Sequence, residues 1–336
     1  MKKIALMLSA AACIACSGLV SESDDSILAG NGKGMVTVTV QQAPSATKAQ
    51  TDYTTVLPDE MNVRKVAVLV FDKTTGTLNA SKEIATTGEK CTFTVTAGEK
   101  TIYAVANGPD LSSVTTLSQL GQAVDDLSQS DIGTHGLMMT GSCDCTVEAG
   151  GTASPIISVR RMVARVVLQK VTCSLPSQYG SMTLDCIYLG NANTVQTLAG
   201  AVSGKVNPDG YADAQKTKPI GKNGVTGSCP NYLFYNSGYN ISVGSSKTTK
   251  YHFYCQPGDD SSVTCMYLLA TIGGNQYYYR VPLNVGLNAN TTCSVELEIT
   301  NLGAPIPPDG DLQKGEISAT INVAGWDAGN KYEVEF

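Results

Sequence analysis

Charged side chains are scarce in this 336-residue chain, at 15% against about 25% in a typical soluble protein. The formal net charge is −6, so the sequence lacks the excess of basic residues that a nucleic-acid-binding protein needs. Histidine occurs only 2 times, which disfavours a metalloenzyme. We therefore exclude nucleic acid as a partner, and we expect no metal and no cofactor.

Turn-forming residues are abundant by contrast. The 33 Gly and 13 Pro, together with recurrent Ser and Thr, fit short strands separated by frequent turns. At roughly 100 to 200 residues per domain, the length predicts two domains. The expected fold class is therefore mainly all-β, with two β-rich domains.

The first sixteen residues have the pattern of an export signal. Met1–Lys3 is positively charged, and Ile4–Ala15 is apolar but shorter than the about 20 residues of a membrane span. The run ends in Cys-Ile-Ala-Cys-Ser, which resembles a bacterial lipobox with Cys16 as the lipid acceptor. A weaker frame ending at Cys13 and an ordinary cleaved signal peptide are alternatives. Residues 17–48 then form a polar, Gly-rich tether followed by a first strand.

Cysteines outside the signal number nine, because two of the 11 lie within it. Export permits disulfides, but an odd number leaves at least one thiol without a partner in its own chain. The connectivity cannot be deduced from the sequence. Cys143 and Cys145 could face one side of a strand, but no second pair at zinc spacing supports a metal site. We expect structural roles for these residues.

Alternation of apolar and polar residues is the dominant pattern. Val36, Val38 and Val40 alternate with threonines, as in a half-buried strand. The last residues alternate in the same way, so the chain is expected to end as a strand, with one face formed by Tyr332, Val334 and Phe336.

A single helix is predicted, over 116–127, where Leu and Val recur at spacings of three and four. Between the expected strands, 160–168 places three arginines in an apolar run, where each must reach solvent or find a partner. We divide the chain into an N-terminal β domain over 49–173, a C-terminal β domain over 174–314, and final strands over 315–336.

No catalytic constellation is found. Residues 200–206 are one residue short of a phosphate-binding loop and place Val where Ser or Thr must bind magnesium. The Gly-rich 30–34 has no preceding strand and is not a dinucleotide fingerprint. His135 and His252 have no nucleophile at a recognisable spacing. The triple tyrosine 277–279 is more typical of a β-domain surface than of a sugar platform, and we expect no enzyme activity.

Several segments that run through most of the chain carry a resemblance to a known family. They are the lipobox at Cys16, Val66–Asp72 with Thr75–Gly76, Tyr103–Asn107, Met139–Gly141, Arg161–Val166 and Ile321–Trp326. Each segment alone is partly generic strand sequence. Together, and in the expected order, they resemble the fimbrillin superfamily of Bacteroidia, the FimA- and Mfa1-like subunits of type V pili.

The resemblance implies two β-sandwich, transthyretin-like domains with one or two short helices. It also implies export as an outer-membrane lipoprotein and maturation by a surface protease. In this scheme the protease removes the first strand, and the C-terminal strand of a neighbouring subunit fills the resulting groove. The mature protein would then be part of a fimbrium on the cell surface and would contact other copies of itself and other pilus subunits.

The residues of this chain fit that scheme with one departure. The removed strand would contain Val36, Val38 and Val40, and the donor strand would be the final one. Relatives commonly place Arg-Ala after the first strand, whereas this chain has Lys48 and Ala49. We therefore expect a trypsin-like enzyme to cleave after Lys48. Arg64 is a poorer site because it is predicted to lie in a strand.

Two alternative functions remain open at the level of sequence. The chain could be an anchor or tip adhesin of the same pilus, because a terminal strand can also fold back into its own sheet. It could instead be a monomeric surface lipoprotein that binds glycans through Tyr277–Tyr279. The adhesion target is not predicted.

Overall fold

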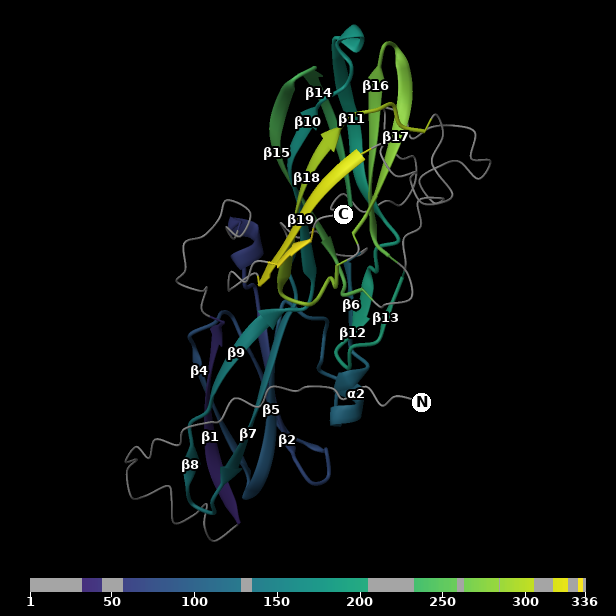
Figure 1. Cartoon of the computed structure of the whole chain (residues 1–336). Helices are drawn as coiled ribbons and strands as arrows, with labels where there is room; N and C mark the ends of the chain where they lie inside the picture. Colours follow the sequence, from purple (N-terminus) through teal and green to yellow (C-terminus); the bar gives the residue numbers. More distant parts are fainter. Residues whose placement is uncertain are drawn as a thin grey trace.

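The computed structural model describes eight segments of the chain: 32–43, 57–127, 135–204, 233–258, 263–283, 285–304, 317–325 and 332–334. The molecule is elongated, with the N-terminal strands at one end and the C-terminal strands at the other (Figure 1). Strands dominate the described residues, and the short helix α2 (Leu117–Gly121) is accompanied by two 3-10 turns, η1 (Pro58–Met61) and η3 (Ser177–Tyr179). The predicted all-β fold is confirmed.

The N-terminal half is built on one 8-stranded sheet that folds over a core of its own. The strand order is β3-β2-β5-β7-β9-β1-β4, with β8 paired to β1. Strand β9 pairs with both β7 and β1 and so joins the two layers. The strands are β1 (Lys33–Gln42), β2 (Val66–Asp72), β3 (Leu78–Ile84), β4 (Lys90–Thr96), β5 (Gly98–Ala106), β7 (Met139–Val147), β8 (Thr152–Ala153) and β9 (Ile156–Arg161).

The C-terminal half encloses a larger core between two sheets. One has the order β15-β10-β18-β19-β20 and the other β14-β11-β16-β17. The strands are β10 (Ala164–Cys173), β11 (Ser181–Gly190), β14 (Phe234–Ser242), β15 (Ser245–Cys255), β16 (Cys265–Ile272), β17 (Asn275–Pro282), β18 (Thr291–Ile299), β19 (Ile317–Gly325) and β20 (Tyr332–Val334).

Strand β10 pairs with β15 and β18 and therefore belongs to the C-terminal sheets. The division drawn from the sequence after Cys173 grouped this strand with the N-terminal half. In the structure the chain leaves the N-terminal sheet at Arg161, the last residue of β9, and enters the C-terminal sheet at Ala164. The first five residues of β10 are all buried, so its start has no alternation that indicates which sheet it joins.

The predicted helix over 116–127 is wrong beyond its first turn. Thr116 caps α2 by accepting a hydrogen bond from the Gln119 amide, and the helix ends at Gly121. Residues Val124–Asp126 form a strand, β6, that pairs with β12 (Val195–Thr197), which in turn pairs with β13 (Val202–Ser203). The three-stranded sheet links the two halves, and its long-range pairing overrides the local helical spacing of the leucines.

The described cysteines are all buried except Cys145, which is partly buried. Burial raises the pKa of the Cys255 thiol to about 12. It also raises that of the Cys186 thiol to about 12. These two thiols are therefore protonated at neutral pH, which makes them poor nucleophiles. Cys229 lies outside the described residues, and so does the signal with Cys13 and Cys16.

Candidate assembly site

Strand β1 lies inside the N-terminal sheet, with a partner along each edge (Figure 1). On one side it pairs antiparallel with β4 over seven residue pairs, from Lys33↔Thr96 to Thr39↔Lys90. On the other side it pairs parallel with β8 at two positions and with β9 at four. The first described strand of the chain is therefore an interior strand, and its loss would open two sheet edges that face each other.

The inward face of β1 is apolar, as its sequence predicts. Val36, Val38 and Val40 are 0% exposed and pack into the N-terminal core. Burying one such side chain contributes about 1.5 to 3 kcal/mol. On the opposite face the Thr37 and Thr92 hydroxyls lie 3.0 Å apart across the β1–β4 ladder. The three valines thus mark the depth and spacing of the groove that β1 fills.

The two ends of β1 differ in their contacts. Near its start a Cβ at Gly34 would collide with the Glu148 carbonyl oxygen, so a larger residue does not fit there. At its end the Gln42 Nε2 donates to the Met61 carbonyl at 2.9 Å, and the Ala43 amide donates to the Val159 carbonyl at 3.0 Å. The predicted cleavage residues Lys48 and Ala49 lie beyond this end, outside the described residues.

The final strand β20 occupies a sheet edge. It pairs with β19 at three positions, Ile321↔Val334, Asn322↔Glu333 and Val323↔Tyr332. The strand belongs to the five-stranded C-terminal sheet, whereas β1 belongs to the N-terminal sheet. One chain therefore does not bring Tyr332 and Val334 together with the β1 valines. Phe336 lies outside the described residues.

A buried ionic cluster joins the two halves. The sequence did not predict which residues form it. Glu60 on η1 and Arg165 on β10 are both 0% exposed, and Arg165 Nη1 donates to both Glu60 carboxylate oxygens at 2.9 and 2.7 Å. The Tyr254 hydroxyl donates to Glu60 Oε1 at 2.7 Å. Arg161 donates through Nε and Nη2 to the Glu60 carbonyl, each at 3.3 Å. The arginines in the apolar run were the available signal, but their partner lies more than a hundred residues away.

A second polar contact also joins the two halves, and we call the region that contains both contacts the seam. Asp125 on β6 is 7% exposed and accepts a hydrogen bond of 2.6 Å from Gln256 Nε2. Burial raises the pKa of the Asp125 carboxyl to about 6, against the smaller opposing effect of the Gln256 hydrogen bond. The seam between the halves thus contains a carboxyl group that titrates in mildly acidic solution.

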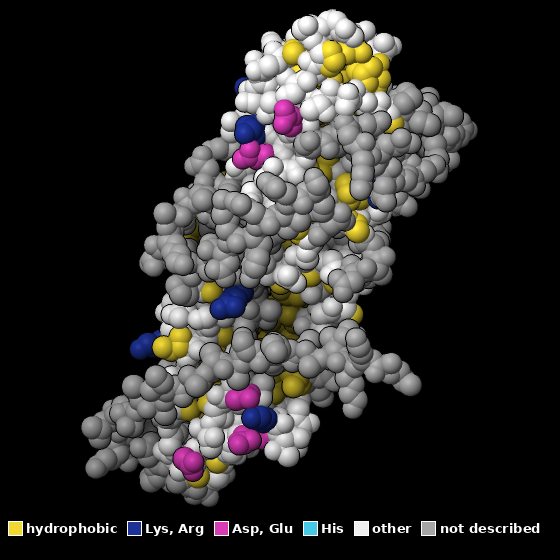
Figure 2. Space-filling model, in the orientation of Figure 1, with side chains coloured by type: hydrophobic (Ala, Val, Ile, Leu, Met, Phe, Trp, Pro, Cys, Tyr) yellow, Lys and Arg dark blue, Asp and Glu magenta, His cyan; other side chains and the backbone are white. Residues whose placement is uncertain are grey.

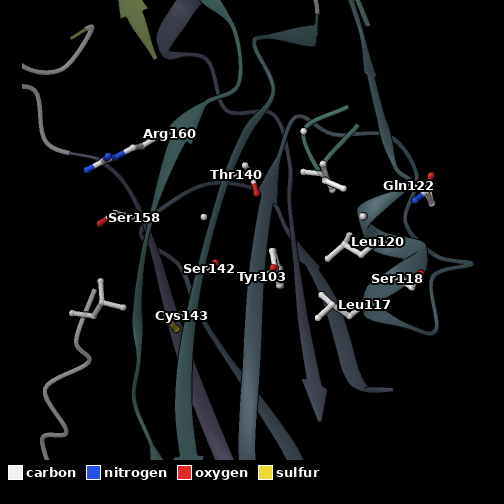
Figure 3. A pocket seen from close by; sticks show the side chains of 16 residues that line it. Tyr103, Leu117, Ser118, Leu120, Gln122, Thr140, Ser142, Cys143, Ser158 and Arg160 are labelled. Carbon is white, nitrogen blue, oxygen red and sulfur yellow. The ribbon is translucent and has the colours of Figure 1, made fainter. Parts of the chain in front are cut away.

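A hollow of about 880 Å³ lies between the outer face of the N-terminal sheet, α2 and the β12–β13 turn (Figure 3). Leu117 and Leu120 point into it from the helix, and Tyr103 and Ser142 lie on the sheet side. Arg160 is the charged residue in its lining, and its side chain points outward at the rim. On the face shown in Figure 2, basic and acidic side chains of the described residues lie singly or in mixed groups.

Other predicted sites do not assemble into a centre. Tyr278 and Tyr279 are 0% exposed, so the triple tyrosine is not a surface platform for sugars. Within the described residues no group of three or more His, Cys, Asp and Glu could hold a metal ion. The same part of the chain includes no helix long and apolar enough to cross a membrane.

Comparison with family models gives a match over part of the chain. Residues 35–159, which run from β1 to β9, match the family model of the major fimbrial subunit protein (FimA). No curated protein matches the chain in sequence.

Solved structures share the fold at low sequence identity. A proposed cell adhesion protein from Parabacteroides distasonis aligns with a TM-score of 0.61 at 18% identity, covering 87% of this chain and 97% of that one. A similar protein from Bacteroides eggerthii gives 0.59 at 17% identity, covering 88% and 96%. A fimbrilin from Porphyromonas gingivalis gives 0.58 at 14% identity, covering 88% and 98%. The predicted resemblance is therefore confirmed: the chain has the fimbrilin fold, and its residues 35–159 match the FimA family of major fimbrial subunits.

Proposed function

We propose that the chain is a structural, non-enzymatic subunit of a type V fimbria and that it polymerises by strand exchange. The observation that carries the proposal is the position of β1. It is the first described strand, yet it fills an interior position between β4 and β9 with three fully buried valines. A cut after the C-terminal end of this strand would separate it from the rest of the chain without interrupting any later strand.

The proposed assembly has three steps. The precursor is exported and held in the outer membrane by lipid on Cys16. A trypsin-like surface protease then cleaves after Lys48 and releases β1. The final strand of a neighbouring subunit enters the groove, with Tyr332, Val334 and Phe336 in the places of the three valines. The spacing of two residues is the same in both strands, so alternate side chains meet the same pockets.

The energetics favour exchange over an empty groove. A groove without a strand exposes the apolar core and two unpaired sheet edges, which associate readily with other strands. Burial of three to five apolar side chains at about 1.5 to 3 kcal/mol each stabilises the donor by roughly 5 to 15 kcal/mol before the cost of ordering it. This range is sufficient for a durable polymer.

Treatment of the purified precursor with trypsin tests the proposal. We expect filaments by electron microscopy and a mature N-terminus at Ala49 by sequencing. The Lys48→Ala variant, which removes the predicted cut, should remain monomeric under the same treatment. Filaments from cells whose subunits still begin at Cys16 would contradict the shaft role and favour an uncleaved anchor or tip subunit.

The anchor or tip role remains the alternative within the same pilus. A donor strand is required of a shaft subunit, because each copy must fill the groove of the next. Within the described residues β20 pairs with β19 at three positions, which supports a strand that leaves its own sheet easily. The glycan-binding alternative loses its proposed platform because Tyr278 and Tyr279 are buried.

A further inference from the structure

We infer that Glu60 is a positioning residue for maturation: it holds the residues that follow the cut on the C-terminal half, so that only the segment before the cut leaves. This inference rests on the proposed function, because it concerns what stays behind when β1 is removed. The segment in question is 57–61, which the structure describes as the short turn η1 and the residue before it.

Glu60 is the only buried residue of η1. Met61 is 53% exposed, and Asp59 is also exposed. Hydrophobic packing therefore holds little of this turn in place. The hydrogen bonds that tie the turn to Arg161, Arg165 and Tyr254 all end on residue 60, at its carboxylate or its carbonyl.

The partners of Glu60 all lie outside the segment that would be removed. Its carboxylate accepts bonds from Arg165, Tyr254 and the Leu57 amide, the last at 2.7 Å. Its carbonyl accepts from Arg161. The contact of the turn with β1 is a hydrogen bond from Gln42 to the Met61 carbonyl, on the exposed surface. Departure of β1 thus breaks a surface bond and leaves the buried cluster complete.

Release of the turn would be costly for a physical reason. Glu60 and Arg165 have no access to water, so withdrawal of the carboxylate would remove the charge that Glu60 places against a buried guanidinium. The Tyr254 hydroxyl would lose its acceptor at the same time. Burial and the neighbouring Glu60 carboxylate raise the pKa of Tyr254, so this hydroxyl stays protonated and continues to donate.

Retention of the turn has a consequence for assembly. A free stretch after the cut could re-enter the groove or let β2 fray from its first residue, Val66. With residue 60 anchored, β2 and the seam keep their positions while the groove is empty. The incoming strand then meets a preformed site, which lowers the cost of ordering on binding.

Hydrogen exchange measured by mass spectrometry on the peptide 57–62 tests the proposed role of Glu60. A sequence-specific viral protease site placed over residues 50–55 makes the cut independently of trypsin and of the natural processing site. In the wild-type sequence we expect exchange of this peptide to change less than twofold after the cut. In Glu60→Gln we expect exchange at least tenfold faster after the cut, because the neutral amide cannot balance Arg165.

A second variant and a control keep the test decisive. Tyr254→Phe removes a single hydrogen bond to Glu60, so we expect a several-fold increase even if Glu60→Gln fails to fold. Val68→Ala weakens the N-terminal core, where Val68 is fully buried, without touching the seam. It should lower the melting temperature but leave exchange of 57–62 slow.

Three results would overturn the proposed role of Glu60. They are fast exchange of 57–62 in the cut wild-type protein, unchanged exchange in both seam variants, and an equal increase in Val68→Ala. None of them depends on filament formation. Failure of the proposed function would instead appear as absence of filaments or of a cut at Lys48, with the exchange result unaffected.

Discussion

The two ends of the described chain occupy opposite kinds of position in their sheets. At the N-terminal end, β1 is interior and is paired along both edges, and its inward valines are fully buried. At the C-terminal end, β20 lies at a sheet edge and pairs over three residues with one neighbour. An interior strand leaves a deep groove when it departs, whereas an edge strand can leave its sheet with little loss. This difference supports the proposed exchange, in which the position of β1 is the acceptor and β20 is the donor.

A charge placed on the buried face of β1 is expected to have the largest effect and tests whether β1 is an interior strand. Val38→Asp places a carboxylate in the N-terminal core, where no water reaches it, and we expect a loss of more than about 4 kcal/mol in the free energy of unfolding. Urea unfolding provides the measurement. Thr37→Asp, on the outer face of the same strand, is the matched control and should cost far less. Equal losses at the two positions would mean that β1 is not an interior strand in solution.

A smaller effect is expected from the seam between the halves. The pKa of Asp125 is raised to about 6 in the folded state, so the folded protein binds this proton more tightly than the unfolded chain does. The Asp125 contribution is therefore greatest below pH 4 and is lost as the pH rises to about 6, by on the order of 2 to 3 kcal/mol. Asp125→Asn should abolish this component of the pH profile.

The control for the pH profile is Asp126→Asn. Asp126 acts on Asp125 only as a nearby charge, the smallest of the causes of the shift, so most of the pH dependence should persist. Other carboxyl groups contribute with the opposite sign at lower pH, Asp72 among them, whose pKa is lowered to about 2 mainly by its hydrogen bond with Lys100. The difference between wild type and variant isolates Asp125. Identical profiles for wild type and Asp125→Asn would contradict the burial of this carboxyl.

Deletion of 331–336 probes the donor end. Because β20 adds three paired residues at an edge, we expect the monomer to lose no more than about 1 kcal/mol of unfolding free energy. Filament formation after trypsin treatment should nevertheless be abolished. Electron microscopy and urea unfolding of one preparation give the two readouts. Filaments of normal length from the shortened chain would exclude this strand as the donor.

The smallest effect is expected at an exposed ion pair of the C-terminal half. Lys170 Nζ lies 2.7 Å from Glu296 Oε2, and both side chains are about two-fifths exposed, at 42% and 39%. Lys170→Gln should reduce the unfolding free energy by less than about 1 kcal/mol, and the difference should vanish in 1 M salt. A larger, salt-independent loss would show that Lys170 stabilises this half by contacts other than its exposed ion pair.

Local patterns predicted much of the fold and the first strand of the site. The period of two at Val36, Val38 and Val40 sets which face of β1 is buried, and the structure places all three in the core. The family resemblance supplied the role of that face. Neither the period nor the resemblance could indicate that β1 pairs antiparallel on one side and parallel on the other, because pairing joins residues far apart in sequence.

The errors have the same physical origin. The leucines near residue 120 have helical spacing, but pairing of β6 with β12, some seventy residues away, ends the helix early. The arginine at 165 needed a partner, and its identity as Glu60 depends on how the two halves meet. The tyrosines at 278 and 279 gave no sequence sign of burial, since an aromatic strand can face either way.

The unequal edges around β1 carry one more consequence, which concerns symmetry. A strand that replaces β1 in the same direction runs antiparallel to β4 and parallel to β9, and one that enters reversed has the opposite relations, so the two directions of an incoming backbone are not equivalent in this groove. In the proposed exchange, donor and acceptor are different surfaces of the same molecule, and such heterologous contacts do not close into a dimer. A polymer built this way is polar from end to end and presents a free groove at one tip and a free strand at the other.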